Sequence, residues 1–518
     1  MNTPDAASPP LARMVCVLLI VTAAAMAVGR VLSAQLVYEP GLSESWPNDP
    51  DHPRRKWPAT APRAMPTFSS NDRSRWAAVR ALVDQGTWVI GRRDKQSGKD
   101  SGIIFEDGWQ SVDKMLNPDT LEFYSTKPPL LTFLVAGEYW LLKQTFGWSL
   151  DDETPEGGRD QGFAVVRVCL LTFNVLPFVV YLILLARLAE RFGVTDWGRV
   201  FVVAAASFGT LMTPFLITLN NHTLAACSVV VAVYAAVRIL SSSSGANWTW
   251  FLVAGFFAGF TFTNELPAAA FTIGLGLLLL LRFVKRTLLA YAPAVLVPVA
   301  ALGLLNWEVM GNPLDIGYSK FGTEWYEYEG SHWKPRPDQS QRGIDWAKNK
   351  ENKGAYAFHL LLGHHGWFAL TPVYLLALWG MGLGVWRLGR APDQPGAPVT
   401  GQTNPSLALR AGNASSRLWA ELAVSTLLLS LVVIAYYIFK SNNYGGWSNG
   451  PRWLMWLTPL WLLTMLPIAD RLGQRRWGRI LCLALLACSV LSAHYWDWNP
   501  WRHPWIYNWM DARGWIPY

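Results

Sequence analysis

The sequence predicts an all-α polytopic membrane protein with about eleven transmembrane helices. Hydrophobic residues make up 51% of the 518 residues, and only 15% are charged, whereas soluble domains carry about 25% charged residues. The apolar residues also occur in long runs such as 165–186, and about 20 such residues span a bilayer core as a helix. Because backbone groups inside lipid must bond to one another, each run is expected to be helical.

Eleven segments have the length and apolarity of spanning helices: 14–36, 163–186, 198–217, 222–240, 249–265, 267–284, 288–306, 360–386, 418–439, 452–469 and 479–495. Many of the 29 tryptophans lie at the ends of these segments, which is typical of side chains that anchor helices at the membrane interface. The first segment also resembles a signal peptide, but its apolar stretch continues past Arg30 to Leu36. This length favours an uncleaved first helix.

The distribution of basic residues predicts the sidedness of the chain. Four loops, near 187–199, 282–286, 387–417 and 471–479, are rich in Arg and Lys, as cytoplasmic loops are. If the apolar segment 128–147 crossed the membrane, every later loop would change sides, and all four Arg-rich loops would lie outside. That segment contains Glu138 and Lys143, each costing about 2.5–3.5 kcal/mol at a helix centre. We therefore expect an amphipathic helix in the outer interface and a cytoplasmic N-terminus.

Three polar features stand out on the external side. Asn71 and Asp72 open a helix predicted near 73–85, where either side chain can cap the helix or Asp72 can act as a general base. Lys127 stands at the start of the interfacial helix, where it can contact a lipid headgroup or a phosphate that also meets helix amides. Arg452 begins an external helix, where an anion such as phosphate explains a positive charge better than topology does.

Other polar residues lie where predicted spans meet the external side. His222 begins the fourth span and Glu265 ends the fifth, and a carboxylate at such a depth is a functional candidate. His359, His364 and His365 open the eighth span. They can bind a metal or a phosphate, but no carboxylate at a ligand spacing accompanies them, so hydrogen-bonded interfacial histidines are the alternative.

These residues carry a resemblance to a known family. The acidic helix start, "GTWVI" (86–90) and "YSTKPPLLTFLVAGEYWLLKQTFG" (124–147) resemble the first external loop of the GT-C superfamily of membrane glycosyltransferases. The chain looks most like the branch with protein O-mannosyltransferases and lipid A aminoarabinose transferases. Similar stretches follow over most of the chain: "NNHTLAA", "GNPLDIGYSKFG", "GHHGWFALTPVYLLALWG" and "GGWSNGPRWLMWLTPL".

The resemblance implies an inverting glycosyltransferase of the plasma (inner) membrane. It would move a sugar from a polyprenyl-phosphate carrier to an extracytoplasmic acceptor, which is a lipid, a glycan or a protein. Asp72 matches the catalytic carboxylate, and Lys127 and Arg452 would hold the donor phosphate. The residues expected to line the cavity are Asn71, His222, Glu265, His364, His365 and Tyr318.

The chain departs from the family pattern at two places. The family's acidic pair appears as Asn71 and Asp72, and the spacing puts Asn71 in the position that is usually catalytic. Other external carboxylates are therefore alternative bases: Asp107, Asp113 and Asp119. Thr126 replaces an acidic residue that some members have before the lysine. No cofactor is thus implied with certainty, and a divalent metal stays open.

This reading divides the chain into three regions. Residues 1–390 form the GT-C-like transmembrane catalytic region, with external segments at 37–162 and 307–358; residues 391–416 form a flexible cytoplasmic linker; and residues 417–518 form a C-terminal transmembrane region with an external tail. The basic residues form short clusters between hydrophobic runs rather than one continuous stripe, which argues against nucleic-acid binding. The alternative functions are a transporter or flippase of lipid-linked or anionic cargo, and a non-catalytic GT-C-derived scaffold.

Overall fold

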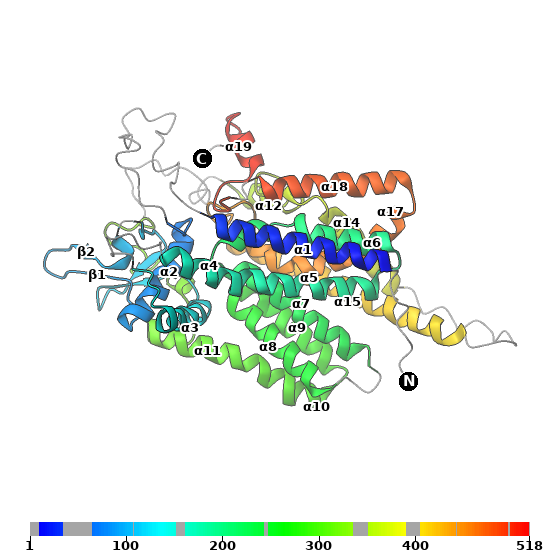
Figure 1. Ribbon diagram of the computed structural model, residues 1–518, viewed down its shortest axis with the longest axis horizontal. Helices are drawn as coiled ribbons and strands as arrows, with labels where there is room; N and C mark the ends of the chain where they lie inside the picture. Colours follow the sequence, from blue (N-terminus) through cyan, green and yellow to red (C-terminus); the bar gives the residue numbers. More distant parts are fainter. Residues whose placement is uncertain are drawn as a thin grey trace.

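A computed structural model describes residues 10–34, 65–106, 108–151, 161–242, 247–334, 351–389, 405–441, 443–495 and 498–516. The chain folds into a helical body, and the segment predicted to be the first external loop lies at one end of it (Figure 1). We call its described residues, 65–106 and 108–151, the external segment. The helices of the body are α1 (Pro10–Ser33), α4 (Gln161–Leu170), α5 (Leu176–Phe192), α6 (Asp196–Phe208), α7 (Asn221–Leu240), α8 (Trp248–Asn264), α9 (Ala269–Leu280), α10 (Val284–Arg286), α11 (Ala292–Met310), α14 (Tyr374–Gly389), α15 (Pro405–Lys440), α16 (Thr458–Thr464), α17 (Leu466–Gly473) and α18 (Arg476–His494). The chain also forms the short helices α12 (Lys353–Leu361), α13 (Trp367–Leu370) and α19 (Trp505–Asp511).

The number of membrane spans is smaller than predicted when helix length is the measure. Among the described residues, six helices are long and apolar enough to cross a membrane, and a seventh arises if Arg452–Thr464 and Leu466–Gly473, inclined by 44°, form one span. The predicted spans 198–217, 249–265, 267–284 and 360–386 contain helices of 13, 17, 12 and 16 residues. The chain is a multi-pass helical membrane protein, but the count of eleven is not confirmed.

The external segment contains a small sheet that the sequence analysis did not predict. Strands β1 (Gly91–Arg93), β2 (Asp100–Ser101), β3 (Lys114–Leu116) and β4 (Glu122–Ser125) pair in the order β2-β1-β4-β3. All three pairings are antiparallel, with Arg92 opposite Ser101, Gly91 opposite Phe123 and Met115 opposite Tyr124. The sheet lies between α2 (Ser70–Arg80) and α3 (Pro129–Phe146) in the chain and adds a β element to the otherwise helical fold.

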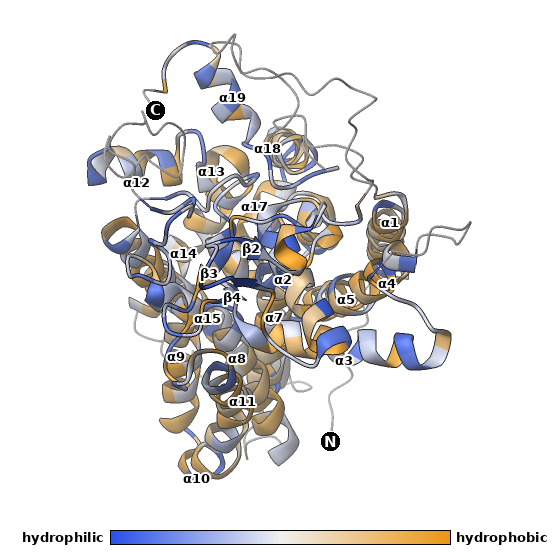
Figure 2. Ribbon diagram, turned by 90° about the vertical axis from the view of Figure 1, so that its left-hand side faces the viewer, coloured by the Kyte–Doolittle hydropathy of each residue, from blue (hydrophilic) through white to orange (hydrophobic). Residues whose placement is uncertain are grey.

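Helix α3 lies across the end of the helical body. In Figure 2, α1, α5 and α11 are seen close to their axes, whereas α3 runs across the view. One side of α3 buries Leu131, Val135 and Tyr139, while Phe133 and Trp140 remain about half exposed at 50% and 51%. This orientation and the exposed apolar side chains agree with the predicted interfacial helix at 128–147.

The end of the predicted linker 391–416 is helical. Residues 391–404 lie outside the described part of the chain. Helix α15 begins at Pro405 and includes residues 405–416. The sequence there, "PSLALRAGNASS", contains several good helix formers (Leu, Ala, Arg), and Pro is tolerated in the first turn of a helix.

Candidate active site

Asp72 lies buried near the start of α2. The N-cap of α2 is Ser69 rather than Asn71 or Asp72, because the Ser69 hydroxyl accepts the Asp72 N–H at 3.4 Å. The Asp72 carboxylate is fully buried; Oδ2 accepts the Phe68 N–H at 3.1 Å and Oδ1 accepts the Leu219 N–H at 3.0 Å. Burial raises the pKa of Asp72 to about 6, against the lowering effect of these bonds. Both oxygens are therefore committed to backbone groups.

Asp113 and Lys127 come together through the register of the β3–β4 hairpin. Lys114 lies opposite Ser125, so the residues just before β3 and just after β4 share one end of the hairpin. The Lys127 ammonium donates to Asp113 Oδ1 at 2.7 Å, and the two side chains are 13% and 17% exposed. In the described part of the chain this is the one hydrogen bond that the Asp113 carboxylate accepts, so Oδ2 is available to another donor.

Helix α2 places an arginine beside this pair. The Ser74 hydroxyl donates to the Asp113 carbonyl at 2.5 Å and shares a 2.7 Å hydrogen bond with the Ser125 hydroxyl. The next residue, Arg75, is buried and donates to the side-chain oxygens of Asn71 and Asn221. Arg75 was not singled out from the sequence, although its position one helical turn after Asn71 was a usable signal.

The start of α7 and the end of α8 form one polar network. Asn220 caps α7 by accepting the Thr223 N–H at 3.0 Å. The Asn221 amide donates to Glu265 Oε1 at 3.1 Å, and the His222 ring bonds to the same oxygen. His222 and Glu265, both 5% exposed, thus join Arg75 through Asn221. The structure brings together these two predicted cavity residues.

Arg75, Lys127 and Arg452 form a group that we call the cationic cluster. Burial and then Arg452 lower the pKa of Arg75 to about 10. Burial also lowers the pKa of Lys127 to about 8; Asp113 opposes this shift, while Arg75 and Arg452 add to it. Burial raises the pKa of Asp113, but Lys127, Arg452 and Arg75 outweigh burial and hold it below its usual value. The three cations therefore lie within electrostatic reach of one another and of Asp113.

The Arg452 side chain is supported from two sides. Its guanidinium lies over the Trp501 ring, 4.6 Å from the centroid. On the other side, a Cβ built on Gly445 would lie 3.3 Å from Arg452 Nε, and Gly445 has a positive φ of 98°. A glycine is therefore required both by the left-handed backbone and by the close approach of the arginine.

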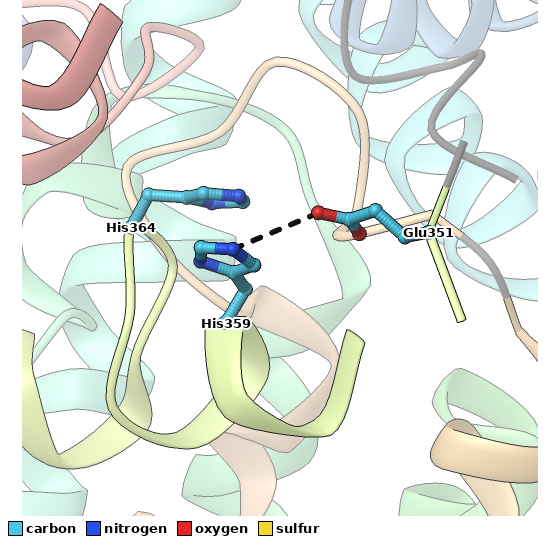
Figure 3. A group of neighbouring side chains, drawn as sticks. All are labelled: Glu351, His359 and His364. Carbon is cyan, nitrogen blue, oxygen red and sulfur yellow. Dashed lines mark ion pairs between the residues drawn. The ribbon is translucent and has the colours of Figure 1, made fainter. Parts of the chain in front are cut away.

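The histidines predicted to line the same cavity form a separate group. His364 and His365 share a hydrogen bond of 2.6 Å between their Nδ1 atoms, and both rings are fully buried. Glu351, His359 and His364 offer ligand atoms that all lie within 4.8 Å of one another (Figure 3). The expectation that no carboxylate accompanies the histidines was therefore wrong, because Glu351 precedes them by several residues and meets them through the turn after α12.

Of the remaining candidates, two are exposed and one lies outside the described residues. Tyr318 is 62% exposed and stacks on Phe321 at 6.2 Å. Asp119 is exposed in the β3–β4 turn, and Asp107 lies outside the described residues. Of the two alternative carboxylates that the structure describes, Asp113 lies beside Lys127.

No protein-family model and no curated protein matches this chain. Among solved structures, an oligosaccharyltransferase from Archaeoglobus fulgidus, in complex with Zn and sulfate, aligns at 12% identity and a TM-score of 0.43, over 96% of this chain and 55% of that chain. This chain thus spans little more than half of that protein. The same archaeal enzyme (AglB), with an inhibitory peptide and a dolichol-phosphate, aligns at 11% identity and a TM-score of 0.43, over 96% of this chain and 57% of that chain.

ArnT from Cupriavidus metallidurans, bound to undecaprenyl phosphate, aligns at 11% identity and a TM-score of 0.32, over 92% of this chain and 77% of that chain. At such TM-scores the likeness identifies neither a substrate nor a reaction. The function therefore has to be inferred from the side chains of this chain.

Proposed function

We propose that this protein is a membrane glycosyltransferase that moves a sugar from a polyprenyl-phosphate carrier to an extracytoplasmic acceptor. The observation that supports this function is the cationic cluster, in which Lys127 pairs with one partly exposed carboxylate, Asp113, while Arg75 and Arg452 act on that carboxylate electrostatically. The cluster gathers three cationic side chains at one place, and arginine and lysine are the residues that bind phosphate.

The position of the cluster suits a donor that is anchored in lipid. Lys127 directly precedes α3, whose exposed apolar side chains fit the membrane interface. Arg452 begins a short 3₁₀ helix, Arg452–Leu457, which leads directly into α16. A phosphate held there would keep its polyprenyl chain among the helices while its sugar faces the external sheet.

The step that this arrangement supports is a displacement at the anomeric carbon. The acceptor hydroxyl oxygen forms the new bond to that carbon, and its proton passes to Asp113. The bond from the carbon to the phosphate oxygen breaks, and the electron pair leaves with the polyprenyl phosphate, whose charge is stabilised by the cationic cluster. Asp113, kept ionised by its cationic neighbours, is the proposed base; Asp72 is a positioning residue.

The test is a transfer assay in membranes. Membranes with and without the protein would be supplied with radiolabelled polyprenyl-phosphate sugars, and products released from the carrier would be counted. We expect protein-dependent transfer for at least one sugar, and its loss when Asp113 is changed to Asn. Binding of the carrier without transfer from any donor would favour the non-catalytic scaffold, and passage of label across proteoliposomes without a glycosidic product would favour a transporter.

A further inference from the structure

A second group of side chains that can bind a metal lies around α12 and the turn that follows it. Glu351 directly precedes the N-cap of α12, His359 lies in its last turn, and His364 follows it. Their ligand atoms all lie within 4.8 Å of one another. Figure 3 shows the two imidazole rings one above the other, with the Glu351 carboxylate facing them from the side.

The spacing of these groups is closer to that of metal ligands than to that of a hydrogen bond. Glu351 Oε1 lies 3.7 Å from His359 Nε2, which is too long for a hydrogen bond. Two ligands on one tetrahedral ion, with bonds of about 2.1 Å, lie about 3.4 Å apart. The rings of His359 and His364 are stacked, with centroids 4.0 Å apart and planes inclined by 17°, so one ring has to tilt before the nitrogens of both can point at one ion.

The surrounding residues orient these ligands as outer partners of a metal site do. The Tyr444 hydroxyl donates to Glu351 Oε2, which leaves Oε1 facing His359. The Nδ1 atom of His364 is engaged by His365, which leaves Nε2 as the ligand atom. Ligating histidines and carboxylates usually have such partners for their second polar atom.

Close packing holds the two rings in place. A Cβ on Gly363 would overlap the His359 ring, so the turn leaves space only for glycine there. Tyr444 packs against both His364 and His365, with centroid distances of 4.8 and 5.2 Å. The pocket is thus shaped before any ligand enters, which lowers the cost of binding.

We propose that Glu351, His359 and His364 bind a divalent transition-metal ion of the Zn²⁺ class. Two imidazoles and one carboxylate are a donor set that Zn²⁺ accepts, with a fourth position open to water, whereas Mg²⁺ and Ca²⁺ prefer oxygen ligands alone. The site does not depend on the proposed glycosyl transfer, since it shares no residue with the cationic cluster.

The site also has a structural consequence for the loop 443–451. Tyr444 bonds to Glu351, and its neighbour Gly445 contacts the Arg452 side chain. A metal ion on Glu351 would therefore fix the loop that supports Arg452. An effect of the metal ion on phosphate binding by Arg452 would rest on the proposed function, whereas the metal site itself does not.

The experiment uses the full chain in detergent, purified with an affinity tag that contains no histidine. The protein is stripped with a chelator and given Zn²⁺; bound zinc is then measured by mass spectrometry of the metal after gel filtration. We expect one zinc per chain in the unmodified protein and its loss in Glu351→Gln and His359→Asn. The control is His332→Asn, an exposed histidine whose loss should leave the zinc content unchanged.

Two further measurements keep the proposal falsifiable if a ligand variant fails to fold. Zn²⁺ should raise the melting temperature of the unmodified chain, and Tyr444→Phe, which keeps the ring packing, should weaken zinc affinity about 10–100-fold. Substoichiometric zinc without a rise in melting temperature would overturn the proposal. Equal zinc retention by the folded ligand variants and by His332→Asn would do so as well, because it would assign the zinc to other groups.

Discussion

Asp72 and Asp113 lie in the same external segment but differ in what their carboxylate oxygens contact. Asp72 is fully buried, and each of its oxygens accepts a backbone N–H. Asp113 is 17% exposed and pairs through one oxygen with Lys127. A base must reach the proton that it removes, so the contacts favour Asp113 for that role and assign Asp72 to holding α2 against the segment before α7.

The two carboxylates therefore predict different mutant phenotypes. Asp113→Asn should reduce transfer by about 10²–10⁴-fold, as loss of a general base does, and should also lower the melting temperature, because Lys127 loses its ion-pair partner. Asp72→Asn points an amide N–H at a backbone N–H and should cost about 1–3 kcal/mol of stability, measured by thermal unfolding.

The matched control for both variants is Asp119→Asn, which changes an exposed turn residue and should alter neither quantity. If Asp72→Asn abolished transfer at full stability while Asp113→Asn remained active, the two roles would have to be exchanged.

Lys127 predicts how activity depends on pH. Burial, together with Arg75 and Arg452, lowers its pKa to about 8, although Asp113 opposes the shift. Lys127 is therefore charged below about pH 8 and neutral above it, so phosphate binding should weaken as pH rises through that value. The alkaline limb of kcat/KM, which reports the free enzyme, should lie near pH 8.

Lys127→Arg separates this effect from other titrations, because arginine stays protonated throughout. The variant should move the alkaline limb of kcat/KM to higher pH, whatever its absolute rate. An alkaline limb at the same pH in both proteins would show that another group controls it.

At the scale of elements, the hairpin register and a close backbone contact build the site. The pairing of Lys114 with Ser125 sets Asp113 beside Lys127. The second external segment then packs on the same loop, since a Cβ on Gly317 would overlap the Thr126 carbonyl oxygen. Thr126, the residue before Lys127, thus contacts both the β3–β4 hairpin, through the Asp113 carbonyl, and Gly317.

Gly317→Ala should push these two external segments apart. We expect it to cost about 1–3 kcal/mol of stability, as overpacking does, and to lower transfer by displacing Lys127. Gly137→Ala on α3 is the control, because no atom lies within 4 Å of a Cβ there. Equal activities and melting temperatures for the two variants would show that the 317–126 contact does not support the site.

The sequence predicted the elements that have a strong local signal. Long apolar runs identify helices by composition alone, and the charges in 128–147 separated α3 from the spanning helices. The sheet could not be predicted, because its strands of two to four residues are too short for an alternating pattern.

The site was only partly predictable for a related reason. Lys127 and Arg452 stood out because an unexplained charge at a membrane face is a local anomaly. Arg75 did not, and Asp113 was only one of three alternative bases, since the role of both residues depends on how α2 and the hairpin pack. The approach of His364 to Glu351 and His359 depends in the same way on the turn after α12.

At the scale of the whole molecule, the account requires residues from distant parts of the chain to meet at one end of the helical body. Arg75 belongs to α2, Lys127 precedes α3, and Arg452 begins the C-terminal bent pair. The external segment with its sheet lies at that end, beyond the ends of α1 and α5 (Figure 1). We propose that this end lies outside the cytoplasm. The Arg-rich loops that follow α5, α9 and α17 would then all lie on the cytoplasmic side of the membrane.

The most direct test of the central claim is native mass spectrometry of the detergent-solubilised protein with undecaprenyl phosphate and, separately, with undecaprenol. The account predicts one bound undecaprenyl phosphate per chain and no comparable binding of undecaprenol. It also predicts at least about tenfold weaker binding when Arg75→Gln and Lys127→Gln are combined, since each charged hydrogen bond contributes about 1.5–3 kcal/mol. The matched control, Arg92→Gln with Lys95→Gln on the exposed β1–β2 hairpin, should bind normally. Equal binding of undecaprenyl phosphate by the two double variants, or of undecaprenol by the unmodified protein, would contradict the account.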